Sequence, residues 1–103
     1  MTKYHAIPTE VNGIRFDSKK EAQRYQELKL LVRAGEISHL RMQVKYDLIV
    51  NGEKVGFYKA DFVYRDERTV TEIVEDTKGF KTPVYRLKKK LMHACYGIDI
   101  LET

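Results

Sequence analysis

The middle of the chain contains three strand-like runs divided by two turn signals, and this pattern restricts the fold more than any other feature. The first run, Val44–Val50, alternates apolar and polar side chains and ends at Asn51-Gly52, a dipeptide typical of tight hairpin turns. The second extends through Tyr58 to Tyr64, and a charged turn, Arg65–Arg68, leads into a third run from Thr69 to about Lys78. Short turns between successive strands predict a three-stranded antiparallel meander.

Helix signals flank this meander on both sides. Ser18 is a candidate N-cap, and the segment Lys19–Ala34 has helical periodicity before Gly35 ends it. A second helix is expected to begin after the Thr82-Pro83 pair, which suits the N-cap and first helical positions, and to end at Gly97.

The ends of the chain add shorter elements. An Asn-Gly pair in Val11–Ile14 predicts a tight hairpin, and Ile98–Leu101 is short enough to be a final strand. The expected fold class is therefore α/β of the α+β type, in the order α-β-β-β-α-β, with a mixed sheet flanked by helices. Residues 1–103 are expected to form a single domain.

The amino-acid composition limits the partners and the cellular setting that we expect for this chain. The 103 residues include 19 Lys and Arg against 15 Asp and Glu, a net charge of +4 that permits a polyanionic partner without requiring one. The lone Cys95 excludes an internal disulfide and the histidines are scattered, so we expect a reduced, cytoplasmic setting and no zinc cluster. No run approaches ~18 apolar residues, so we expect no membrane partner.

Acidic residues inside two of the expected strands indicate a candidate site. Asp61 lies within the apolar run Ala60–Tyr64, where strand propensity favours almost any other residue. In the next strand, alternation places Asp76 and Lys78 on one face. Simple ion pairs are the alternative, Asp61 with Lys59 or Lys78 and Asp76 with Lys78. Two or three acids near one lysine nevertheless leave negative charge for a divalent cation, and oxygen ligands favour Mg²⁺ or Mn²⁺ over zinc.

The first helix carries a further acid on its apolar stripe. Glu21 shares this stripe with Tyr25, Leu28 and Val32, at offsets of about four, seven and eleven residues. A carboxylate aimed at the core is costly unless a positive group receives it. Alternatively, Glu21 completes a capping box with Ser18 and bends back to the helix start. The sequence leaves both arrangements open.

Basic residues gather near and within the second helix, where they indicate either phosphate contact or a solvated helix face. On an expected strand, Gln43 and Lys45 share a face that is able to approach a scissile phosphate or the polar side of the sheet. The candidate nucleic-acid-binding residues are Gln43, Lys45, Lys81, Arg86, Lys89 and Lys90.

The second helix has an expected core face. Val84, Leu87, Leu91 and Cys95 form one apolar stripe, which predicts that these four pack on the sheet. Tyr85 is expected to face away with the basic residues, where aromatic groups suit stacking on bases.

These motifs together support a resemblance. The stretches Phe16–Ala22, the region of Gln43, Ala60–Phe62 and Glu75–Gly79 place a helix acid, a strand acid and an acid-x-Lys motif in one order. This order resembles the PD-(D/E)XK nuclease superfamily, whose core is αβββαβ, and in particular a family of small phage and prophage proteins assigned to it. The set is also similar to the Holliday-junction resolvase and transposon-end nuclease branches.

The resemblance implies a role for each acid. Asp61 and Asp76 look like the strand carboxylates that bind the catalytic Mg²⁺, and Glu21 looks like the helix acid that completes or supports the metal shell. Lys78 looks like the lysine that orients or deprotonates the attacking water. Two departures stand out, since Lys59-Ala60 replaces the proline that names the superfamily and Asp76 stands where many members carry Glu.

The implied function is a Mg²⁺-dependent DNA endonuclease, structure-selective or weakly sequence-specific, acting in phage or mobile-element recombination, repair or processing. Its expected partner is duplex or branched DNA in the cytoplasm of a bacterial cell or phage-infected host. Cutting both strands symmetrically requires two active sites, and hence a homodimer. The alternatives are a non-catalytic DNA-binding or assembly module with this fold, and a small protein-interaction domain.

Overall fold

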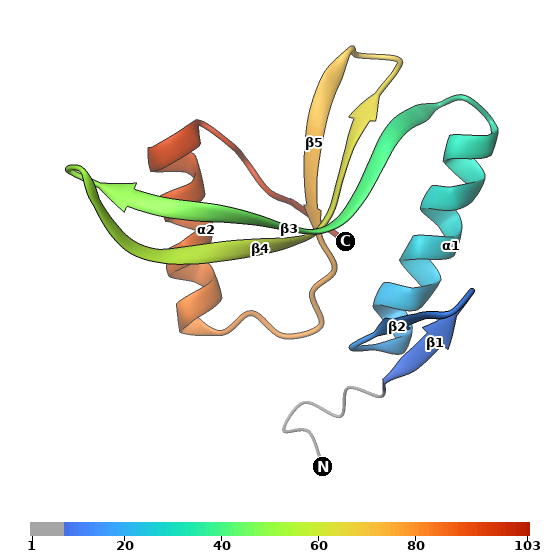
Figure 1. Ribbon diagram of the computed structural model, residues 1–103, viewed down its shortest axis with the longest axis horizontal. Helices are drawn as coiled ribbons and strands as arrows, with labels where there is room; N and C mark the ends of the chain where they lie inside the picture. Colours follow the sequence, from blue (N-terminus) through green and yellow to red (C-terminus); the bar gives the residue numbers. More distant parts are fainter. Residues whose placement is uncertain (1–7) are drawn as a thin grey trace.

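A four-stranded mixed sheet, a separate two-stranded hairpin and two helices make up the α+β fold (Figure 1). The computed structural model describes residues 8–103. In chain order the elements are β1 (Thr9–Val11), β2 (Ile14–Phe16), α1 (Lys19–Arg33), β3 (Ile37–Val50), β4 (Glu53–Asp66), β5 (Thr71–Asp76), α2 (Pro83–Tyr96) and β6 (Leu101–Glu102). No helix in the described range is long and apolar enough to cross a membrane.

The sheet has the order β3-β4-β5-β6. Strands β3, β4 and β5 pair antiparallel, which confirms the predicted meander, and β6 lies parallel to β5. The predicted hairpin is also confirmed, because β1 pairs antiparallel with β2 around Asn12 and Gly13, whose φ angles of 52° and 78° suit a type I′ turn.

The predicted start of the first long strand at Val44 was wrong, because β3 begins at Ile37. The strand register shifts between Ser38 and Arg41, and His39 has a φ of 53°. Such an irregularity puts the apolar residues on its two sides out of phase. The apolar alternation extends back from Val44 through Met42 to Leu40 and is interrupted only at His39.

Each helix starts and ends as its local sequence predicts. Ser18 Oγ accepts a hydrogen bond from the Glu21 amide at 3.1 Å, and Thr82 Oγ1 accepts one from the Tyr85 amide at 3.1 Å. Gly97 ends α2 in the left-handed conformation, with a φ of 68°. Gly35, with a φ of 77°, likewise follows the C-cap Ala34 of α1, so local capping chemistry sets all four helix ends.

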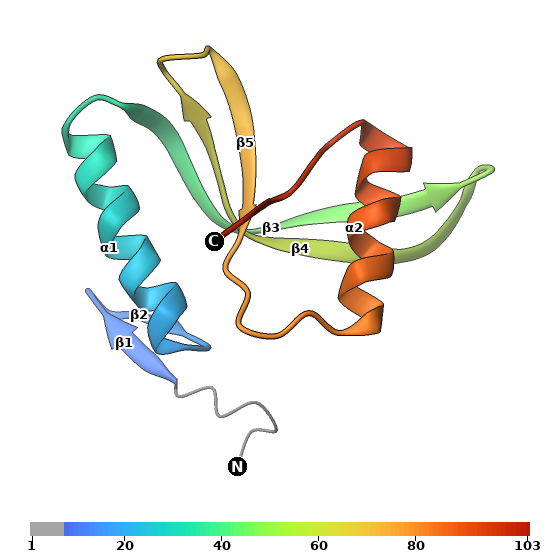
Figure 2. The same cartoon turned by 180° about the vertical axis from the view of Figure 1, so that it is seen from behind.

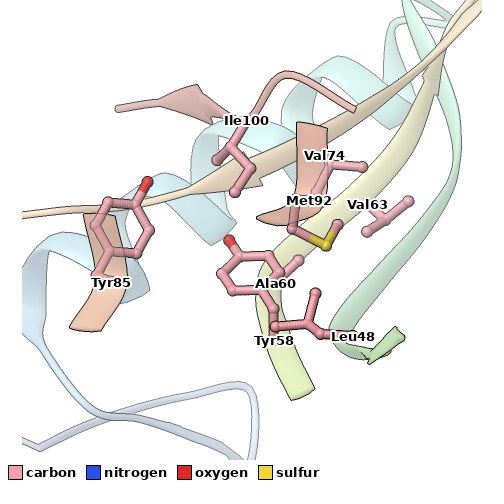
Figure 3. Close-up of a cluster of buried hydrophobic side chains, with 8 residues drawn as sticks. All are labelled: Leu48, Tyr58, Ala60, Val63, Val74, Tyr85, Met92 and Ile100. Atoms are coloured by element: carbon pink, nitrogen blue, oxygen red, sulfur yellow. The ribbon is translucent and has the colours of Figure 1, made fainter. Parts of the chain in front are cut away.

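Two hydrophobic clusters lie along the sheet, one under each helix (Figures 1 and 2). The cluster beneath α1 includes Leu28 and Phe62, neither of which is exposed. The cluster beneath α2 is drawn in Figure 3 and is composed of Leu48, Tyr58, Ala60, Val63, Val74, Tyr85, Met92 and Ile100. The helices therefore anchor different parts of the sheet, with the middle of β4 between them.

The predicted core face of α2 was wrong in part. Val84 and Leu87 are 62% and 57% exposed, whereas Tyr85 and Met92 are buried. Burial of Tyr85 is tolerated because its hydroxyl donates a hydrogen bond to Glu102 Oε2 at 2.7 Å. The helix is consequently turned away from the stripe that apolar spacing indicated.

Candidate functional site

Strand β5 carries two adjacent buried acids to opposite faces of the sheet. Asp76 lies on the face that points toward Asp61 and Lys78, while Glu75 lies on the α1 side. The Tyr58 hydroxyl donates to Asp76 Oδ2, and Lys78 Nζ lies 3.2 Å from Asp76 Oδ1. This Oδ1 atom is buried and makes no hydrogen bond among the described residues.

Asp61 adds a second carboxylate beside Asp76. Its Oδ2 accepts a hydrogen bond from the Thr77 amide at 2.9 Å. Burial raises the pKa of Asp61 to about 8, helped by hydrogen bonding with and repulsion from Asp76, and by repulsion from Glu21. Carboxylates this close compete for protons unless a cation neutralises them.

Glu21 reaches the same region from α1. It is only 6% exposed, and its Oε2 accepts a hydrogen bond from Gln43 Nε2 at 3.1 Å. Burial raises its pKa to about 7, with further contributions from the charges of Asp17 and Asp76. Of the two arrangements that the sequence left open, the side chain adopts the inward one, while its backbone amide still serves the Ser18 cap.

Gln43 makes this approach possible through an unusual backbone. Its φ of 53° lies in the left-handed region, which a residue other than glycine rarely adopts inside a strand. Ladder pairs are present on both sides, Met42 with Phe62 and Val44 with Ala60, but Gln43 has no such pair. Backbone strain of this kind gathers at functional sites.

Lys78 is held by contacts on several sides. The predicted strand end at Lys78 was wrong, since β5 ends at Asp76. The extended path nevertheless continues, because the Lys78 amide donates to Thr103 O at 3.0 Å and Lys78 O accepts from Lys20 Nζ at 2.9 Å. Its ammonium lies 4.3 Å from the centroid of the Tyr85 ring. The lysine is thus fixed beside Asp76 without being buried.

The acids fit a hard divalent cation that takes few protein ligands. Among residues 8–103, no three acidic, histidine or cysteine side chains are arranged to enclose a metal ion. Mg²⁺ in phosphate-processing sites usually takes one or two carboxylates and completes its shell with water and substrate. Asp61 and Asp76 supply such a pair, and Asp76 Oδ1 makes no hydrogen bond in the described structure, although the Lys78 ammonium lies 3.2 Å from it.

The predicted nucleic-acid-binding residues separate into two groups. Gln43 contacts Glu21, and Lys45 lies over Phe57, both on the sheet. The remaining four are on or before α2: Lys81, Arg86, Lys89 and Lys90 line an open hollow of about 570 Å³.

Two lysines of that hollow share one carboxylate. Lys81 Nζ and Lys89 Nζ lie 3.0 and 3.2 Å from Glu102 Oε1. The Tyr85 hydroxyl, followed by these lysines, lowers the pKa of Glu102 to about 2. This hollow is therefore less basic than its lysine count indicates.

Sequence reasoning missed the second buried acid and its partners. Arg24 grips Glu75 with two hydrogen bonds, Nε to Oε2 at 2.7 Å and Nη2 to Oε1 at 3.0 Å. The Tyr64 and Thr103 hydroxyls also donate to Glu75, at 2.7 and 3.1 Å. One signal was available, because Arg24 stands three residues after Glu21, near the stripe expected to face the sheet.

Comparison with known proteins assigns the chain to a family but gives no activity. No curated protein and no solved structure matches it. One family model does match, over residues 1–100, and its description reads protein of unknown function (DUF1064). Because this match covers nearly the whole chain, the protein belongs to the DUF1064 family.

Proposed function

We propose that this protein is a Mg²⁺-dependent endonuclease that hydrolyses DNA phosphodiester bonds, with a core of the PD-(D/E)XK type. The observation that carries the proposal is the meeting of Asp61, Asp76 and Glu21, with Lys78 Nζ 3.2 Å from Asp76. A structural ion pair needs one acid for each base. Here burial, followed by the neighbouring acids, raises the pKa of both Glu21 and Asp61.

Each side chain has a role in this proposal. Asp61 and Asp76 hold the cation, which when bound lowers the pKa of a coordinated water and neutralises charge on the phosphate. Tyr58 fixes the Asp76 carboxylate through its hydroxyl, and Gln43 fixes Glu21. Lys78, held over the Tyr85 ring, orients the attacking water.

The proposed substrate is structured or weakly specified DNA. A domain of 103 residues has little surface beyond its core with which to read base edges, so contacts to the backbone dominate. Recombining, branched or damaged DNA presents its backbone in distinctive geometry. Symmetric cutting of both strands calls for a homodimer with two sites.

A cleavage panel tests the proposal. Single-stranded, duplex, flap and four-way-junction DNA are incubated with Mg²⁺ or Mn²⁺, using the wild type, Asp76→Asn and Lys78→Ala. We expect the two variants to lose at least ~100-fold in rate. Glu72→Gln is the matched control, because Glu72 is an exposed acid on the same strand. Equal cleavage by Asp76→Asn and Glu72→Gln refutes the site, and no cleavage of any substrate by the wild type refutes the activity.

A non-catalytic DNA-binding or assembly module is the second candidate. It is favoured by the 3.2 Å contact between Lys78 Nζ and Asp76 Oδ1, which supplies the acid with a counter-charge. Isothermal titration with Mg²⁺ and Mn²⁺ separates the two candidates. The nuclease binds the cation and loses this binding in Asp76→Asn, whereas the module binds neither metal.

A further inference from the structure

We propose that the uncovered face of the β3–β4 arm holds a DNA phosphate through Lys45 and Lys88, which lie over the Phe57 ring, and through Lys59, the ladder partner of Lys45. The arm consists of the paired residues from Val44 opposite Ala60 to the turn at residues 51–52. The inference deepens the proposed function and rests on it, because it names the protein surface that would hold the DNA substrate.

The two faces of the arm differ in what covers them. Tyr58 and Ala60 point into the cluster beneath α2. Phe57 and Lys59 alternate with them and point to the opposite face of the arm. Figures 1 and 2 show α2 against one side of the arm and no other helix against the other. Phe57 and Lys59 therefore lie on the face of the arm that neither helix covers (Figures 1 and 2).

The charges on this face repel one another. Lys45 and Lys59 are directly opposite each other in the antiparallel ladder, and like charges in this position are destabilising. Within residues 8–103, neither they nor Lys88 has a carboxylate within ion-pair distance. Asp47, which is opposite Phe57, is paired with Lys54 at 3.3 Å.

Phe57 gathers two of these lysines. Its ring is 41% exposed, and the ammonium groups of Lys45 and Lys88 lie 4.7 and 5.1 Å from its centroid. Lys45 comes from β3 and Lys88 from α2, so the Phe57 ring brings together positive charges from two elements. A phosphodiester relieves this repulsion and matches the two ammonium donors.

The arm fits a DNA strand better than the hollow along α2 does. In that hollow, Lys81 and Lys89 share the carboxylate of Glu102. On the arm, the lysines have no such partner in the described structure, so their full charge is available to phosphate. Neutralising these phosphates releases counterions and makes binding depend on salt.

Binding measured without cleavage tests the proposal. The full-length chain is titrated onto labelled single-stranded and duplex DNA in EDTA, at several salt concentrations, and followed by fluorescence anisotropy. We expect Lys45→Ala/Lys88→Ala to weaken binding at least roughly tenfold at low salt. The slope of log affinity against log salt should fall by about 0.9 per lost contact on duplex DNA, or about 0.7 on single strands. Lys29→Ala/Arg33→Ala, which removes the same charge from exposed positions of α1, is the matched control.

A second variant separates binding from folding. Lys59→Ala removes one of two opposed positive charges, so it should weaken DNA binding while leaving the Tm unchanged or slightly raised. Equal affinity and slope in the arm and control double variants, or no DNA binding by the wild type, overturns the inference. Normal arm-dependent binding with no cleavage in Mg²⁺ or Mn²⁺ instead refutes the nuclease and leaves the phosphate-binding face standing.

Discussion

Glu75 and Asp76 are neighbours on one strand and both are buried, yet their surroundings differ in kind. Glu75 accepts hydrogen bonds from the Arg24 guanidinium and from two hydroxyls, so both of its oxygens are satisfied. Asp76 has one hydroxyl donor, an oxygen without a hydrogen bond, and further acids nearby. Glu75 is thus paired with a guanidinium through two hydrogen bonds, whereas Asp76 lies 3.2 Å from the Lys78 ammonium and among further acids.

The difference shows that burial alone does not determine how completely an acid is paired. A buried acid costs stability unless its charge and lone pairs are met. At Glu75 the chain meets that cost with its own residues. At Asp76, Asp61 and Glu21 the chain provides fewer hydrogen-bond donors and positive charges than it does at Glu75.

The largest expected effect comes from removing the base that pairs with Glu75. Arg24→Ala leaves a fully buried carboxylate without a counter-charge, so we expect a loss of about 3–5 kcal/mol in the free energy of unfolding. Urea denaturation measures it, with Arg24→Lys as the control that keeps the charge but not the two-pronged geometry. A loss below about 1 kcal/mol would show that the Tyr64 and Thr103 hydroxyls satisfy Glu75 by themselves.

Removing an acid on the other face should have the opposite sign. Asp61→Asn reduces repulsion with Asp76 and Glu21, so we expect a gain of about 1 kcal/mol in stability at pH 8, together with loss of cleavage. Glu75→Gln is the matched control and should destabilise the fold. Equal destabilisation by both substitutions would show that the acids on the two faces are equally well paired.

The same acid predicts a pH dependence. Burial raises the pKa of Asp61 from 3.8 to about 8, so the folded state keeps a proton that the unfolded chain has released. Stability should therefore fall as pH rises from about 4 to about 8, and Glu21 contributes in the same direction up to about pH 7. Unfolding in urea across this range measures the slope, which Asp61→Asn should flatten. An unchanged slope in that variant would contradict the raised pKa.

The smallest effect is expected from one of the several partners of Glu75. Thr103→Val removes a hydroxyl that donates at 3.1 Å, while Arg24 and Tyr64 remain. We expect a loss of about 0.5–1 kcal/mol, measured by thermal unfolding. Thr71→Val, at an exposed position earlier on β5, controls for the change of side-chain type. A loss as large as that of Arg24→Ala would mean that the network acts as one cooperative unit.

Much of the fold was predictable because it depends on neighbours in sequence. Ser18, Thr82 and Gly97 set helix ends through bonds or backbone angles within a few residues, and Asn12-Gly13 sets the first hairpin. Alternation also predicted that Asp76 and Lys78 lie together, and their side-chain atoms lie 3.2 Å apart. These features need no knowledge of distant contacts.

Other features of the site depended on contacts that spacing does not reveal. Apolar periodicity put Val84 and Leu87 in the core of α2, but a distant acceptor for the Tyr85 hydroxyl turned the helix the other way. The left-handed backbone of Gln43 carries no local signal, because glutamine does not favour it. The hydrogen-bond partner of the Gln43 side chain is Glu21, which lies on another element.

By itself, the sequence determined where the turns and caps lie, which strands follow one another, and that acids stand where strands prefer apolar residues. Only the tertiary structure decided which of the two adjacent acids pairs with an arginine. Arg24 reaches Glu75 across 51 residues of chain because α1 docks on that face of β5. Asp76, on the opposite face, receives Lys78 and the neighbouring acids instead. Local chemistry fixes the elements, whereas the charge balance of a buried group depends on every element packed around it.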